Sequence, residues 1–148
     1  MRGTHLARVF WIVVALSACA LVDDDAPQSL PALIIFYGDT ATLTLPDSVK
    51  HTASFDVRVK TFAGGCIRET APAQTIMRGR TAEIRLYNVG QGQRGTVCTA
   101  DLLFLSHTVP IVFDSAGSAT IRVIGGRQDA STAGGSVADT LEWAITVR

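Results

Sequence analysis

The segment FDVRVK, residues 55–60, places an apolar residue at every second position and a charged residue between them. Side chains of a β-strand point alternately to the two faces of a sheet, so this pattern predicts a strand with one dry face and one solvated face. The same period of two recurs in residues 41–45, 82–86, 121–123 and 141–147, and residues 32–37 form a short apolar run.

Turn-forming residues separate these segments. They are Gly38-Asp39, Pro46-Asp47, Gly64-Gly65 and residues 90–95, 115–117 and 125–135. No stretch places apolar residues at helical spacing over three turns. Many short strands with frequent turns predict an all-β, antiparallel fold, a sandwich or a barrel, with about seven or eight strands. A single domain is expected at 148 residues.

The segment DLLFLSHTVPIVF, residues 101–113, departs from the alternation. Its continuous apolar run from Leu102 to Leu105 predicts a strand that is buried on both faces, and a short helical turn within residues 102–107 is the alternative. Pro110 has no N–H to donate to a β-ladder, so we expect it at a sheet edge or a bend.

Residues 111–125, IVFDSAGSATIRVIG, resemble the turn and penultimate strand of bacterial immunoglobulin-like modules. The matching positions are Phe113, Asp114, Gly117, Ile121 and Val123. Ala119 stands where these modules often have tyrosine, and the antibody-type Cys…Trp…Cys order is absent because Trp143 follows both later cysteines. The resemblance implies an immunoglobulin-like β-sandwich and no particular function.

The N-terminal segment has the three-part layout of a secretory signal. Arg2 and Arg8 form a basic tip, and the apolar run VFWIVVAL, residues 9–16, is shorter than the roughly 20 residues that a membrane-spanning helix needs. The run ends in Leu16-Ser17-Ala18-Cys19, which resembles the lipobox of bacterial lipoproteins. The alternative is an ordinary cleaved signal with a chance cysteine.

The lipobox resemblance implies that residues 1–18 are removed and that Cys19 becomes the first residue of the mature chain. Its thiol then carries diacylglycerol, and its new amino group takes a further acyl chain such as palmitate. Ala20, where an Asp would signal inner-membrane retention, favours the outer membrane if the organism is Gram-negative. The membrane, reached through Cys19, is thus the first expected partner.

Residues 19–31 read as the lipidated cysteine and a flexible tether, followed by the β-domain at 32–148. The tether sequence ALVDDDAPQSLP carries three consecutive acids and two prolines, and it has too little apolar surface to fold alone. The acids would also be repelled by an anionic membrane surface.

With Cys19 assigned to lipid, Cys66 and Cys98 remain as a pair. An exported chain meets an oxidising compartment, which predicts a disulfide between them, with free thiols or a metal pair as alternatives. Loss of Arg2 and Arg8 with the signal leaves 11 basic against 13 acidic residues, so we expect no nucleic-acid partner.

Catalytic and cofactor signals are weak. Residues 90–95, GQGQRG, match G-x-G-x-x-G, but Thr96-Val97-Cys98 reads as a strand and not as the helix that a dinucleotide site requires. His51 and His107 lie in no hydrolase motif. We therefore predict no enzyme activity, no catalytic residue, no metal and no cofactor.

Two polar loops, residues 90–95 and 125–139, are the expected binding regions. Their candidate residues are Gln91, Gln93, Arg94, Arg127, Gln128 and Asp129. A looser set of arginines either forms an anion-binding patch or lies on solvated strand faces. Its members are Arg68, Arg78, Arg80, Arg85 and Arg94.

These observations predict a lipid-anchored cell-envelope module that binds a protein or glycan or serves a structural role. An inhibitor or accessory subunit of an envelope enzyme is the alternative, which an unpaired apolar edge strand would favour. An envelope hydrolase that uses His51 or His107 is the third hypothesis.

Overall fold

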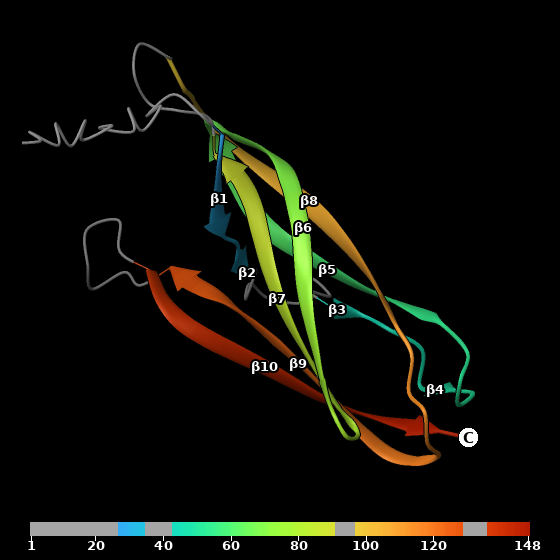
Figure 1. The fold of residues 1–148 in the computed structure, drawn as a ribbon. Coiled ribbons are helices and arrows are strands. Elements are labelled where there is room, and N and C mark those ends of the chain that lie inside the picture. Colours follow the sequence, from blue (N-terminus) through green and yellow to red (C-terminus); the bar gives the residue numbers. More distant parts are fainter. Residues whose placement is uncertain (1–26, 35–42, 91–96, 129–135) are drawn as a thin grey trace, which may run out of the picture.

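A computed structural model describes residues 27–34, 43–90, 97–128 and 136–148 (Figure 1). Strands make up 79% of these residues, and none of the described residues is helical. The all-β prediction is therefore confirmed. No described helix is long and apolar enough to cross a membrane.

Ten strands occur in the described part of the chain. They are β1 (Gln28–Pro31), β2 (Leu33–Ile34), β3 (Leu43–Thr44), β4 (Ser48–Val49), β5 (Phe55–Gly65), β6 (Ile67–Arg78), β7 (Thr81–Gly90), β8 (Thr99–Ile111), β9 (Gly117–Gln128) and β10 (Ser136–Val147). The first four have two to four residues each, which accounts for the excess over the predicted seven or eight.

Three long antiparallel pairs form the body of the molecule, β5 with β8, β6 with β7, and β9 with β10. β7 and β9 pair in parallel, and β2 pairs with both β5 and β9. The order β5-β6-β7-β9-β2 thus closes on itself as a barrel-like ring of five strands, with the other strands added to it. The sequence suggested two separate antiparallel sheets, whereas this ring contains parallel pairs.

The core lies inside the ring and follows the period of two. In β5, Val57 and Val59 are buried while Asp56, Arg58 and Lys60 are exposed. The buried apolar residues are Ala32, Ile34, Val49, Val57, Val59, Ala82, Ile84, Leu86, Val109, Ile111, Phe113, Ala119, Ile121, Val123, Ile145 and Val147. Every long strand except β6 contributes the side chains on its inward face to this core.

The ring closes where the chain crosses from β7 to β5 at Ala32. β1 pairs with the last four residues of β7, and β2 pairs with β5. At the crossing, the Ala32 N–H donates to the Leu86 carbonyl at 3.0 Å, and the Gly126 N–H donates to the Ala32 carbonyl at 2.9 Å. A Cβ at Gly125 would lie 2.6 Å from the Ile34 side chain and 2.9 Å from the Ala32 carbonyl, so a side chain there would separate the strands.

Several boundaries differ from the sequence-based predictions. Gln28–Pro31, which the tether was expected to include, forms β1, so the folded domain begins four residues earlier. The last two strands extend over both ends of the expected 125–139 loop, because residues 125–128 pair with 136–139 as a hairpin. β6 had no predicted counterpart, since most of its residues are exposed and show no alternation.

β8 corrects three expectations. Leu102–Leu105 is not buried on both faces: Leu102 is 66% exposed and Phe104 55%, because no described strand covers the outer face of β8. The alternative of a helical turn at 102–107 is also wrong. Val97 and Cys98 precede the strand instead of belonging to it. Pro110 was expected at an edge, and β8 pairs only with β5 among the described strands.

The predicted disulfide joins Cys66, in the turn between β5 and β6, to Cys98, just before β8. Their Cα atoms are 5.0 Å apart, within the normal range for a disulfide. The bond ties the start of β6 to the start of β8 across a sequence separation of 32 residues.

We predict that Gly125→Val lowers the free energy of unfolding by about 1–3 kcal/mol, because the added side chain overlaps Ile34 and the Ala32 carbonyl where the ring closes. Guanidinium unfolding followed by circular dichroism measures the change. Ala138→Val, at an exposed position of the neighbouring strand, is the matched control and should be close to neutral. Equal stability of the two variants would contradict the tight crossing.

We also predict that reduction of Cys66–Cys98, or the double change Cys66→Ser and Cys98→Ser, destabilises the domain by about 3–4 kcal/mol. The reason is that the open chain gains loop entropy when unfolded. Unfolding curves with and without reductant test this, and the double variant should be insensitive to reductant. A wild-type midpoint unchanged by reductant would show that the bond adds no stability.

Candidate functional site

An apolar row crosses three strands on the outer face of the sheet. Leu33 in β2 lies opposite Phe62 in β5, and Phe62 lies opposite Phe104 in β8. Residues directly opposite in a β-ladder point to the same face, so the three side chains are neighbours. The ring centroids of Phe62 and Phe104 are 5.5 Å apart, a normal distance for an aromatic pair.

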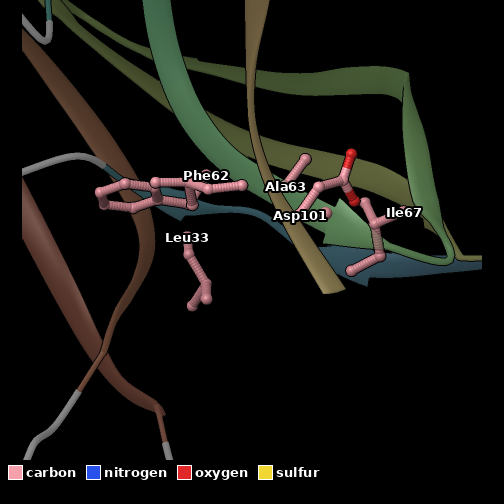
Figure 2. A pocket seen from close by; sticks show the side chains of 7 residues that line it. Leu33, Phe62, Ala63, Ile67 and Asp101 are labelled. Carbon is pink, nitrogen blue, oxygen red and sulfur yellow. The ribbon is translucent and has the colours of Figure 1, made fainter. Parts of the chain in front are cut away.

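A hollow of about 400 Å³ opens beside this row (Figure 2). It is lined by Leu33, Phe62, Ala63, Gly64, Ile67, Asp101 and Leu102. Gly64 is needed at this place, because a Cβ there would overlap the Asp101 carbonyl. Its φ of 146° also belongs to the region that favours glycine. The volume falls within the range of about 300–1,000 Å³ of small-molecule sites.

The polar rim of the hollow is an ion pair beside the disulfide. The Arg68 guanidinium donates to both carboxylate oxygens of Asp101, at 2.7 and 2.9 Å, and also to the Thr99 hydroxyl and the Gly65 carbonyl. The hydrogen bonds from Arg68, and then from Thr99, hold the pKa of the Asp101 carboxyl below its usual value. The rim therefore carries a neutralised pair.

The most exposed large apolar side chains gather at the same end of the molecule. Val97 is 93% exposed, and Leu102 and Phe104 follow at 66% and 55%, whereas every other exposed large apolar residue described is at most 42%. In Figure 1 this is the end where β5 and β7 finish and where β1 and β8 begin. We call Leu33, Phe62, Val97, Leu102 and Phe104 the disulfide-end patch.

The outer face of β7, β9 and β10 has the opposite character. Glu83, Arg122 and Glu142 lie in one cross-strand row, and Arg122 is 2.7 Å from Glu142. Arg85 adds an ion pair to Glu83 at 2.9 Å. Charges of opposite sign alternate along this row, so this face offers little to an apolar partner.

Sequence reasoning missed the apolar row, although a signal was present. In β5 the outward phase reads Asp56, Arg58, Lys60 and then Phe62, so a large apolar residue interrupts a charged series. A phenylalanine at an outward-facing position of a strand whose other outward positions are charged indicates a contact surface on that face.

The predicted binding loops are only partly described. Gln91, Gln93, Arg94 and Asp129 lie outside the described residues. Gln128 ends β9. Arg127 is in β9 and pairs with Asp139 of β10 at 3.1 Å, so it supports the hairpin.

The arginine set does not form a single patch. Arg68 is the second residue of β6 and holds Asp101, whereas Arg78 and Arg80 lie at the turn between β6 and β7, at the other end of the strand. Arg85 is engaged with Glu83, and Arg94 lies outside the described residues. The alternative interpretation, solvated strand faces, fits the described arginines better.

His107 is buried in a polar network and is not poised for catalysis. Its Nε2 lies 3.1 Å from the Thr61 hydroxyl and 3.1 Å from Asn88 Oδ1. Asn88 Nδ2 donates to the Phe62 carbonyl, so Oδ1 is free to accept from His107 Nε2–H. A proton relay needs the hydroxyl and its orienting group on different ring nitrogens, and here both contact the same one.

The second histidine is also structural. His51 Nδ1 is 2.9 Å from the Arg148 carbonyl, and the His51 N–H donates to the same oxygen. Neither histidine has an Asp or Glu side chain as a hydrogen-bond partner in the described part of the chain. Nor do three His, Cys, Asp or Glu side chains gather there as a metal site.

A second cavity, of about 320 Å³, lies between β6 and β8. His107 lines it together with residues 70–73 of β6. The register of β6 against β7 shifts between Ala71 and Gln74, and Pro72 within the shift has no N–H to donate. β6 and β8 therefore border this cavity without pairing.

We predict that His107 makes stability depend on pH. Burial lowers the pKa of its imidazole from the ordinary 6.5, so the unfolded chain takes up a proton more readily than the folded one. The free energy of unfolding should thus fall as pH drops below 6.5. Urea unfolding between about pH 7.5 and 5.5 measures the slope. His107→Gln should flatten it; parallel curves for the wild type and this variant would contradict this prediction.

Comparison with protein-family models, with curated proteins and with solved structures found no match to this chain. The fold and its surfaces are therefore the basis for inferring what the protein does.

Proposed function

We propose that the protein is an exported, lipid-anchored binding module of the cell envelope whose contact surface is the disulfide-end patch. The observation that carries the proposal is the coincidence of the patch with the start of β1. A chain anchored at Cys19 would enter the fold at the end where its most exposed apolar side chains lie.

The length of the intervening segment supports this arrangement. Eight residues lie between Cys19 and Gln28, the first residue of β1, so the fully extended chain from Cys19 to Gln28 spans at most about 30 Å. The inclusion of Gln28–Pro31 in β1 shortens the tether and brings the domain closer to the proposed anchor. The far end of the domain is separated from it by the length of an 11-residue strand as well, roughly 36 Å.

The apolar hollow supports a binding role over a purely structural one. Large apolar residues exposed together at one site commonly mark contact surfaces in monomeric proteins. The disulfide and the Arg68–Asp101 pair hold the β6 and β8 ends of the hollow together, so its shape is set before any partner arrives.

A second candidate function is that of an inhibitor or accessory subunit which docks through β8. β8 has 13 residues, pairs only with β5 among the described strands, and carries Leu102 and Phe104. A long edge strand can accept a strand from another protein, and apolar side chains then add contact area. An immunoglobulin-like relationship also remains a proposal, resting on residues 111–125. We do not propose the hydrolase, given the contacts of both histidines.

We predict that the mature protein begins at Cys19 and carries acyl chains. Intact-mass measurement of the membrane-extracted protein should give cleavage before Cys19, the mass of two or three acyl chains, and the loss of two hydrogens for Cys66–Cys98. Two or three chains hold a protein stably in a bilayer, whereas one does so only marginally.

The control is Cys19→Ser, which cannot form the thioether to diacylglycerol. We expect this variant to leave the membrane fraction while Cys98→Ser remains there. Retention of the Cys19→Ser protein in washed membranes would overturn the proposed anchor.

A further inference from the structure

We infer that the disulfide-end patch rests on the lipid bilayer itself, with Leu102 and Phe104 in the apolar edge of the membrane and Lys60 and Arg58 at the headgroups. The inference rests on the proposed anchor, because the anchor brings this end to the membrane. It names the partner of that surface as lipid.

The order of side chains along the outer face of β5 and β8 carries the inference. From the disulfide end, the outward positions are Leu102, then Phe62 with Phe104, then Lys60 with Ser106, and then Arg58 with Thr108. Successive outward positions are separated by about 7 Å. The face thus changes from apolar to cationic over the depth, roughly 5–10 Å, at which interfacial segments bury their apolar side.

The charges on this face suit an anionic surface, although Asp23, Asp24 and Asp25 before β1 oppose it. Lys60 is exposed and has no ion-pair partner among the described residues, while Arg58 is 4.0 Å from Asp56 in a weak, exposed contact. Asp101, the nearest carboxylate to the hollow, is held by Arg68 and adds no free negative charge. Long cationic side chains reach the headgroups while their neighbours enter the apolar layer.

The other large surface of the molecule does not share this pattern. The outer face of β7, β9 and β10 carries the row Glu83, Arg122 and Glu142. Insertion of this face into lipid would be costly because the exposed side chains of Arg122 and Glu142 would lose water. Of these two faces of the described domain, the one that ends in the disulfide-end patch carries the most exposed apolar side chains, and it is the one that an anchor at Cys19 would bring to a membrane.

The test places a tryptophan at Phe104 and measures its quenching by brominated lipid. The lipidated full-length mature protein carries Phe104→Trp with Trp143→Phe, so that the new indole is its sole tryptophan. It is reconstituted in vesicles of phosphatidylcholine and phosphatidylglycerol with brominated acyl chains. The matched control is Val112→Trp in the same background, because Val112 is exposed just past the far end of β8.

We expect several-fold stronger quenching of the tryptophan at 104 than at 112. Leu102→Asp added to the Phe104→Trp protein should remove most of that quenching, and Met77→Asp, at an exposed apolar position of β6, should not. Near-UV circular dichroism verifies that each variant is folded. Lys60→Glu should weaken quenching in vesicles with phosphatidylglycerol more than in pure phosphatidylcholine.

Two results would overturn the inference and leave the anchor standing. One is equal, weak quenching at 104 and 112 in a protein whose mass shows the acyl chains. The other is a tryptophan at 104 shielded by a second copy, seen as cross-linked dimers without bromine quenching. A protein that lacks acyl chains altogether would overturn the anchor and this inference with it.

Discussion

The close approach of four backbone segments at Ala32 is the constraint on which the rest of the structure depends. β7 and β9 pair side by side as far as Ile124, and beyond that point the β1–β2 segment separates them. The crossing works because Gly125 and Gly126 leave room for Ile34 and Leu33. Without it the ring would be open between β5 and β9, which would then be connected only through β6 and β7, and Val57 and Val59 would lose part of the facing layer that buries them.

Closure of the ring also decides what each outer face can be. The face of β7, β9 and β10 is covered by mutually satisfied charges, while the face of β2, β5 and β8 receives Leu33, which the crossing delivers beside Phe62. The apolar row is therefore a product of topology, because Leu33 lies 29 positions before Phe62 in the sequence and Phe104 lies still farther after it. A feature of this kind arises only when the strands are in register.

Features with a local sequence pattern could be predicted from this chain, whereas features that depend on tertiary contacts could not. The long strands β5, β7, β9 and β10 follow from alternation, and the cysteine pair follows from the counting of thiols. β6 was missed because its exposed, proline-containing sequence has no apolar phase. The reading of Leu102–Leu105 as buried failed because burial depends on whether another layer covers the strand, and that is a tertiary property. The parallel pairing of β7 with β9 has no local sequence signal at all.

The unpaired border between β6 and β8 has a consequence for how the domain opens. At the Pro72 shift β6 loses its pairing with β7, and it borders β8 without any ladder, so this seam is where local unfolding should begin. Its opening would admit water to His107, whose imidazole could then take up a proton and resist reburial. In acid, a protonated His107 would therefore keep β6 and β8 apart at this seam. The disulfide would still hold the start of β8 to the start of β6.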